Sequence, residues 1–389
     1  MKKKKKLKVA ITANPDENLY FSNGVHQNAQ NLFKLLKRSK VVKPYLVYPD
    51  ASFPHLSGPV RVLGEKIYPM SQKIPEVDAL LQVSFGIWHK EDCQSFVDQG
   101  VKLIKVHYGN TFMSHQEEYV FGTHLKDGRR PEGPLKINAS GALKNKDVHT
   151  DAAWVSPHFE WSKQYYGWCD NTKNVSTCPY IWSPDLVKSA NPEHNSLYFR
   201  RDDKNNKNIF VMEPNVNVVK SSFSPLIMCE ILYRKDPKAY DTAFMFCMEK
   251  YRTDPKMIKY LSSYSSVSSG KVTFENRFRL GKILSNGKVM LHHHLLNSLN
   301  YTLLEASYFK LPVVHNSEPM KDFGYYYHNA NVYDGTSQLE AALNHSNLSD
   351  AELESYEDAC DENLWKWSID NPKNLKGYEG LILDVLEKK

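Results

Sequence analysis

The chain has 389 residues, too many for one ordinary domain and enough for two domains that each bury a core. With 41% hydrophobic and 24% charged residues, its composition excludes wholesale disorder. The formal net charge of +6 arises at one end, because the stretch KKKKKLK at residues 2–8 supplies six positive charges. The remaining chain is near neutral, so we expect no nucleic-acid partner.

We expect that the amino-terminal lysine run, from Lys2 to Lys6, does not begin a signal peptide, because the strand-sized segment LKVAITANPDEN follows it. The run is either a solvated terminus, which is the more frequent case, or a weak contact with an anionic membrane surface. No segment approaches the length of a transmembrane helix. The six cysteines are scattered without a CxxC pair, so we expect a reducing compartment and a cytoplasmic location.

Strand-like and helix-like segments alternate over the first 185 residues. An amphipathic helix follows the turn at Ser22, and we predict further helices at 90–99 and 160–166 and strands at 7–13, 45–48, 77–83, 101–107 and 152–156. This alternation predicts a mostly parallel sheet with helices on both of its faces. We therefore expect a first domain over residues 1–185.

Residues 186–208 are rich in Asn, Asp, Pro and charge, which is typical of an interdomain linker. A second series of strands and helices begins at Ile209, and it predicts a second domain over residues 209–368. Its predicted elements include strands at 271–276 and 288–292 and a helix at 278–284. A last helix is expected within residues 369–389.

One carboxylate lies in the otherwise apolar stretch NYTLLEASYFKLPVV, at Glu305. The stretch predicts a helix, a turn at Phe309 and Lys310, and a buried strand. A solvated helix position would explain the charge. We favour the alternative, a helix that begins at the carboxyl edge of a parallel sheet, where ligands of α/β proteins bind.

Three stretches resemble the GT-B glycosyltransferases, especially the large retaining family that carries an E-x7-E signature. VMLHHHLLNSLNYTLLEASYFKLPVV resembles that signature, with Glu305 as its second Glu and Asn297 in place of the first. Residues 151–185 resemble the family's exit from the first lobe. FVMEPNVNVVKSSFSP, from Phe210, resembles the loop that carries an Arg and a Lys against the donor diphosphate, and only Lys220 is obvious here.

The chain also resembles a bacterial family of unknown function that is itself regarded as glycosyltransferase-like. Three segments carry this resemblance: EPNVNVVKSSFSPLIMCE, PHFEWS and SNGVHQNA. The resemblances imply an α/β fold of the GT-B type, with two doubly wound Rossmann-like domains facing a cleft. They also imply that the first domain takes the acceptor, that the second binds the nucleotide sugar, and that the last helix crosses back to the first domain.

Residues of the second domain would then hold a UDP- or GDP-sugar. Lys220 is the candidate cation for the diphosphate, although a surface helix lysine is nearly as frequent. The backbone of Asn300, Tyr301 and Thr302 would add amides at a helix N-terminus. Glu305 would accept hydrogen bonds from the ribose.

Two residues of the first domain are candidates for the acceptor side. Gly24 stands where the family has a glycine near phosphate or sugar, but SNG is equally an ordinary turn. His107 ends a predicted strand, where many GT-B enzymes place a histidine near the sugar; a structural histidine is the competing explanation. His26 and His158 are weaker candidates.

The triplet His292-His293-His294 suggests a metal site, but neighbouring residues of a strand point to opposite faces, so we expect none there. By the resemblance, His294 would instead line the donor pocket. The absence of a D-x-D motif implies metal-independent catalysis with no cofactor. The sequence thus predicts a retaining glycosyltransferase acting on a glycan or other hydroxyl acceptor. A nucleotide-sugar 2-epimerase and a non-catalytic carbohydrate-binding protein are the alternatives.

Overall fold

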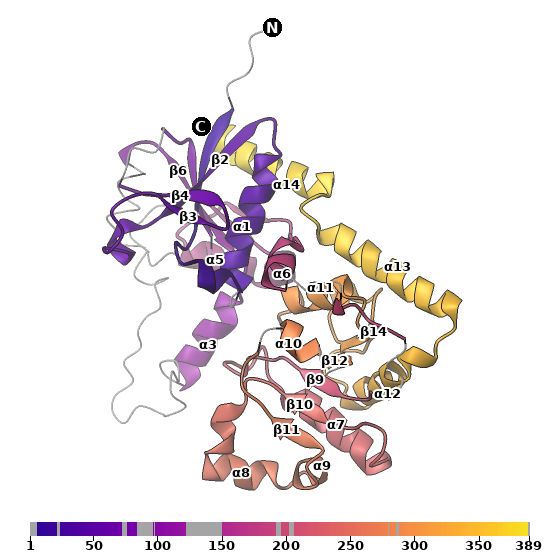
Figure 1. Cartoon of the computed structure of the whole chain (residues 1–389). Coiled ribbons are helices and arrows are strands. Elements are labelled where there is room, and N and C mark those ends of the chain that lie inside the picture. Colours follow the sequence, from indigo (N-terminus) through magenta and orange to yellow (C-terminus); the bar gives the residue numbers. More distant parts are fainter. Residues whose placement is uncertain are drawn as a thin grey trace. The chain divides into compact units, whose positions relative to one another are not determined.

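The computed structural model describes residues 6–21, 24–71, 76–83, 96, 98–121, 150–191, 196–201, 206–278, 280–284 and 288–387 (Figure 1). The chain divides into two compact units. Unit 1 comprises Met1–Leu186 and Trp367–Lys389, and unit 2 comprises Val187–Lys366. Lys2 to Lys5 and most of the helix expected at 90–99 lie outside the described residues.

Unit 1 is built on a sheet in which the described strands have the order β3-β4-β2-β1-β5-β6-β7-β8. All neighbouring strands are parallel except the hairpin of β3 and β4. The strands are β1 (Leu7–Thr12), β2 (Val42–Tyr48), β3 (Val60–Val62), β4 (Glu65–Pro69), β5 (Ala79–Val83), β6 (Lys102–His107), β7 (Ala152–Val155) and β8 (Val175–Thr177). The central strands are buried on both faces, which explains their continuous apolar runs.

The described helices of unit 1 follow the predicted alternation. They are the 3₁₀ helices η1 (Glu17–Phe21), η2 (Asp50–Ser52) and η3 (Pro157–Ser162) and the α-helices α1 (Gly24–Lys37), α3 (Thr111–Phe121), α5 (Lys163–Cys169) and α14 (Pro372–Glu387). Helix α1 buries Leu32, Leu35 and Leu36 and has Lys34 and Lys37 in its last turn, where positive charge suits the helix dipole.

Helix α14 belongs to unit 1 although it ends the chain. Its Tyr378 is fully buried, and the Tyr378 hydroxyl donates to the carbonyl of Pro179 at 2.7 Å and lies 2.6 Å from the hydroxyl of Tyr108. Ile382, on the next turn, is also fully buried. The α14 contacts therefore complete the core of unit 1.

Unit 2 has a second parallel sheet, whose described strands have the order β11-β10-β9-β12-β13-β14. The strands are β9 (Ile209–Val211), β10 (Ala243–Met245), β11 (Val272–Phe274), β12 (Val289–Leu291), β13 (Val313–His315) and β14 (Tyr325–Tyr326). The described helices are α7 (Phe223–Lys235), α8 (Pro255–Leu261), α9 (Ser265–Ser268), α10 (Leu280–Leu284), α11 (Tyr301–Tyr308), α12 (Val332–Leu343) and α13 (Asp350–Trp367), with 3₁₀ turns η5 (Glu249–Arg252), η6 (Glu318–Met320) and η7 (His345–Asn347). Helix α6 (Asp185–Ala190) spans the division between the units.

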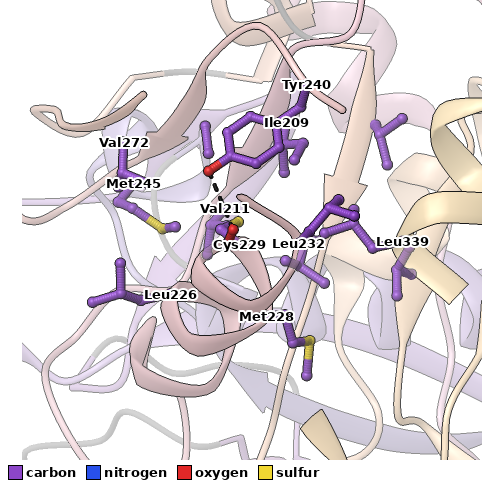
Figure 2. Packing of buried hydrophobic residues seen from close by; sticks show 14 of the residues in the cluster. Ile209, Val211, Leu226, Met228, Cys229, Leu232, Tyr240, Met245, Val272 and Leu339 are labelled. Carbon is purple, nitrogen blue, oxygen red and sulfur yellow. Dashed lines mark hydrogen bonds between the residues drawn. The ribbon is translucent and has the colours of Figure 1, made fainter. Parts of the chain in front are cut away.

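Helix α7 supplies the centre of the unit 2 core (Figure 2). Its Met228, Cys229 and Leu232 are fully buried and pack with Ile209 and Val211 of β9. The hydroxyl of buried Tyr240 donates to the carbonyl of Cys229 at 3.2 Å, so its polar end is satisfied inside an apolar cluster. This packing fixes α7, and with it the loop that precedes it, against the sheet.

Some predicted elements shift in ways that matter for the site. The strand expected at 288–292 ends at Leu291, so the histidine triplet follows the strand instead of lying on it. The alternation argument therefore does not apply to these three residues. Within the described residues, no helix has both the length and the apolar character needed to cross a membrane.

Candidate functional site

The candidate site of unit 2 lies at the carboxyl edge of its sheet. Strands β9, β12 and β13 are parallel neighbours, so the loops that follow them meet at that edge. Glu213 and Lys220 lie after β9, and the histidine triplet lies after β12 and before α11. The predicted residues Lys220, His294 and Glu305 thus lie in the segments that follow two neighbouring strands of one sheet, β9 and β12.

A buried carboxylate–imidazole contact joins these two loops. The Glu213 carboxylate lies 2.5 Å from Nδ1 of His292 and also accepts the backbone N–H of His293 at 3.3 Å. Glu213 is 1% exposed and His292 is 2% exposed, so the pair is shielded from solvent. The Nε2 atom of His292 is buried without a hydrogen-bond partner. The pair ties the end of β9 to the end of β12 beneath the candidate cation.

Lys220 lies in the loop before α7 and not on a helix, which removes the surface-helix explanation. Its side chain is half-buried and lies close enough to Glu213 for the two charges to interact. Burial lowers the pKa of Lys220, and the charge of Glu213 opposes that shift. Asn215 organises the same loop, because its Oδ1 accepts the N–H of Ser222 at 2.8 Å and its Nδ2 donates to Ser222 Oγ at 2.9 Å.

Glu305 lies in the second turn of α11. Its side chain is half-buried, and burial raises the pKa of its carboxyl to about 7. Within the described part of the chain, no donor forms a hydrogen bond with this carboxylate. A desolvated acceptor of this kind is suited to hydroxyl donors from a ligand.

Some backbone N–H groups at the start of α11 already have partners within the helix. Asn300 is the N-cap, and its Oδ1 accepts both the N–H of Thr302 at 3.2 Å and the hydroxyl of Thr302 at 3.3 Å. Tyr301 is the first helical residue and is buried. The Thr302 amide is therefore committed within the helix, and Asn300 contributes as a cap.

His294 is buried and uses both ring nitrogens inside the protein. Its Nε2 donates to the carbonyl of Asn316 at 3.1 Å, and its Nδ1 accepts the N–H of Asn297 at 3.3 Å. Burial lowers the pKa of His294 to about 2, with the neighbouring histidines adding to the shift. A neutral imidazole with both nitrogens engaged holds the loop that leads to α11 and does not face a ligand through them.

Unit 1 has its own polar cluster at the end of β6. The Nε2 atom of His107 lies 2.5 Å from Oδ2 of Asp170, and Lys105 Nζ donates to Oδ1 of the same carboxylate at 3.0 Å. Burial raises the pKa of Asp170, but His107 and Lys105 outweigh it and leave that pKa below its usual value. The His107 ring lies 4.7 Å from the ring of Tyr166. His107 is therefore held in one orientation by a charged partner and an aromatic neighbour.

The other first-domain candidates lie elsewhere in unit 1. Gly24, which the resemblance placed near phosphate or sugar, is the first residue of α1. His26 is buried in α1, where burial lowers its pKa. His158 belongs to η3. Across the described ranges, no three His, Cys, Asp or Glu side chains converge as a metal-binding group.

A family model described as "Protein of unknown function (DUF2827)" matches residues 7–382, which is nearly the whole chain. The chain belongs to this family. No curated protein matches the DUF2827 chain in sequence. The fold is nevertheless shared with solved structures.

Three of these structures show the type of fold. The UDP-forming trehalose-phosphate synthase of Burkholderia xenovorans is 9% identical, with a TM-score of 0.57 and 99% of each chain covered. The trehalose-6-phosphate structure from E. coli bound with UDP-2-fluoro glucose is 11% identical, with a TM-score of 0.56, covering 98% of this chain and 99% of that one. A glycosyltransferase from Rickettsia africae is 9% identical, with a TM-score of 0.51. The match covers 99% of this chain and 100% of that one. The GT-B fold predicted from the sequence is confirmed.

Sequence motifs do not identify two residues of the candidate sites, Glu213 and Asp170. Glu213 directly precedes Pro214 in the stretch that contains Lys220, and its charge within an apolar strand exit was the available signal. Asp170 has no such signal, because it lies 63 residues from His107 and only the fold of β6 against α5 brings them together. The Glu213–His292 and Asp170–His107 pairs are the two buried carboxylate–imidazole contacts of the candidate sites.

Proposed function

We propose that this DUF2827 protein is a glycosyltransferase that moves a sugar from a UDP- or GDP-sugar to a hydroxyl of a glycan or other acceptor. The observation that carries the proposal is the placement of Lys220 and Glu305 at the carboxyl edge of one parallel sheet, each half-buried. The GT-B fold supports it, since a structure of this fold is bound with UDP-2-fluoro glucose.

Glu305 is the proposed ribose acceptor. Burial raises the pKa of its carboxyl group, and no donor from the described residues forms a hydrogen bond with it. Two ribose hydroxyls that donate to the ionised carboxylate would restore the lost hydrogen bonds and favour the charged form. Binding and ionisation of Glu305 are therefore coupled.

Lys220 is the proposed partner of the diphosphate. When the bond between the anomeric carbon and the phosphate oxygen breaks, the leaving nucleoside diphosphate gains negative charge. The ammonium group of Lys220 opposes that charge without a metal ion, and its burial beside Glu213 keeps the charge in a poorly solvated place. The acceptor hydroxyl bonds to the anomeric carbon, and its proton passes to the leaving phosphate. Retention of configuration is part of the proposal and rests on the E-x7-E resemblance.

His107 is the proposed contact for the sugar or acceptor in unit 1. Because its Nε2 is engaged with Asp170, Nδ1 is the nitrogen that would meet a hydroxyl group. A cytoplasmic location also belongs to the proposal.

One observation favours a second candidate, a GT-B protein that binds carbohydrate without catalysis: Asn297 stands where the resembled signature has a carboxylate. Release of UDP or GDP from a nucleotide sugar, measured with and without an acceptor mixture, separates the two. We expect release that persists in excess EDTA. A thermal-shift screen with UDP, GDP and their sugars should show stabilisation by one of them, roughly 2.7 kcal/mol at a hundredfold the dissociation constant. If no nucleotide or nucleotide sugar shifts the melting temperature, the proposed glycosyltransferase function is contradicted, whereas the carbohydrate-binding candidate is not.

A further inference from the structure

A row of four aromatic rings lies on one side of unit 1. The Phe112 ring, at the start of α3, lies 5.4 Å from the Trp161 ring and 5.0 Å from the Tyr165 ring, edge-on to both. The Tyr165 ring stacks with the Trp168 ring at 5.9 Å. Trp161, Tyr165 and Trp168 follow the spacing i, i+4, i+7 through η3 and α5, so they share a face.

The two ends of the row are open to solvent. Trp161 is 53% exposed and Trp168 is 54% exposed, unusual values for the largest apolar side chain. The edges of the row are polar, because the Glu160–Lys163 ion pair, at 2.9 Å, lies on the same segment as Trp161. His115 Nδ1 forms a hydrogen bond with the Tyr165 hydroxyl. The surface thus alternates flat rings with hydrogen-bonding groups.

The aromatic row is continuous with the His107–Asp170 pair. His107 ends β6 and Phe112 lies in the first turn of α3, so one short connection joins the two residues. Within it, the Thr111 N–H donates to the Tyr166 hydroxyl at 3.2 Å, and Tyr166 donates to the carbonyl of Gly109 at 3.0 Å. Tyr166 contacts both the His107 ring, at 4.7 Å, and the Tyr165 ring, at 6.2 Å. One rigid connection therefore carries both the imidazole and the row.

We propose that the Trp161–Phe112–Tyr165–Trp168 row is the binding platform for an oligosaccharide, the extended part of an acceptor whose reacting end lies at His107. The role of the oligosaccharide as an acceptor rests on the proposed function. The binding surface itself can be tested without nucleotide. Sugar rings present an apolar C–H face and a polar rim, which match half-exposed aromatic faces bordered by an ion pair and hydroxyl groups.

The chemistry of the row favours a carbohydrate over an apolar protein helix. An amphipathic helix binds in a hydrophobic groove that receives its i, i+3, i+4 and i+7 anchors. The side chains that form this row are rings, with polar edges at Tyr165 and on the Glu160–Lys163 pair. The row also spans several ring-sized steps, so it fits an oligosaccharide better than a single sugar.

Titration of the full chain with maltohexaose, cellohexaose and chitohexaose, followed by calorimetry and tryptophan fluorescence without nucleotide, tests the platform. We expect one of the three to bind, and glucose to bind at least tenfold more weakly. Trp161→Ala and Trp168→Ala should each weaken binding roughly tenfold or more, and Trp168→Phe should retain most of it. Trp365→Ala is the matched control, because Trp365 is 55% exposed on α13 of unit 2.

Equal melting temperatures of the variants and the wild type establish that binding losses are local. The proposal is overturned if none of the three oligosaccharides binds, if both tryptophan variants bind as the wild type does, or if Trp365→Ala weakens binding equally. Nucleotide binding by the wild-type chain is measured separately. If no oligosaccharide binds while UDP or GDP still binds, only the platform is contradicted. If an oligosaccharide binds while neither UDP nor GDP does, only the donor site is contradicted.

Discussion

The Nε2 atom of His107 lies 2.5 Å from the carboxylate of Asp170, a residue 4% exposed at its side chain that also pairs with Lys105. His107 and Lys105 come from β6, and Asp170 is the C-cap of α5. A carboxylate in this position fixes both the orientation of the imidazole and the nitrogen that carries its proton. His107 is therefore presented as one defined hydrogen-bonding group.

Asp170→Asn should lower the rate of sugar transfer by roughly 10- to 100-fold. A carboxylate that orients a functional histidine typically has an effect of that size. His107→Asn should lower the rate at least as much, because it removes the imidazole that is proposed to contact the sugar or acceptor. Transfer and donor hydrolysis rates are the measurements. Asp151→Asn, which breaks the neighbouring Lys102–Asp151 pair at 2.8 Å, is the control. Equal rates for Asp170→Asn and the control would show that the pair is only structural.

Glu305 should make stability depend on pH in a defined window. Its pKa is raised from 4.5 to about 7 in the folded chain, so the folded state keeps its proton while the unfolded state loses it. The free energy of unfolding should therefore fall as pH rises from about 4.5 to about 7, by on the order of 3 kcal/mol relative to Glu305→Gln. Urea unfolding of both proteins across pH 4 to 8 measures the difference. Parallel curves would mean that Glu305 is solvated.

The Glu213–His292 pair should be strongly coupled. Removing one partner of a buried hydrogen-bonded pair leaves the other group unsatisfied and costs about 1–3 kcal/mol. Glu213→Ala and His292→Ala should each lower the free energy of unfolding by that order, and the double variant should lose much less than their sum. Denaturant unfolding of the two single variants and the double variant gives the coupling energy. Simple additivity would contradict the pairing.

The last helix should stabilise unit 1. Truncation after Asp370 removes α14 and exposes the core around Tyr108 and Pro179, so we expect a large loss of stability in unit 1. Tyr378→Phe is a milder test, because it removes a hydroxyl bonded to two groups and should cost about 1–3 kcal/mol. Tyr333→Phe, at a tyrosine that is 73% exposed, should change nothing. Thermal unfolding measures all three, and an unchanged melting curve for the truncated chain would refute this role.

Sequence patterns predicted the parts of the fold that local chemistry determines. The stretch around Glu305 folds as a helix, a turn and a buried strand, because Asn300 caps the helix and Lys310 adopts the positive φ of 56° that ends it. The charged helix α13 was not predicted, since its hydrophobic pattern is weak and its packing decides its structure.

The site residues show a similar division. Lys220 and Glu305 could be selected from motifs because both lie in stretches with a recognisable strand, loop and helix order. Asp170 could not, because it caps α5 while its partner His107 ends β6, 63 residues away, and no local periodicity connects them. His294 was selected for its position, yet its two ring nitrogens bond to Asn316 and Asn297, a detail that only side-chain geometry reveals.

The central claim is that Glu305 and Lys220 hold a nucleotide-diphosphate sugar without a metal ion. Lys220→Ala should lower turnover more than nucleotide affinity, since the charge on the diphosphate grows as the bond breaks. Steady-state rates in excess EDTA measure this effect. An activity that EDTA abolishes and added metal restores would contradict it.

The most direct test is calorimetric titration of the wild type, Glu305→Gln and the control Glu340→Gln with UDP and GDP in EDTA. Glu340 is an exposed carboxylate on α12, paired with Lys235. One nucleotide should bind the wild type and the control equally, and Glu305→Gln should bind it more weakly by about 1–3 kcal/mol. Binding by Glu305→Gln that equals the wild type would show that Glu305 does not hold the ribose.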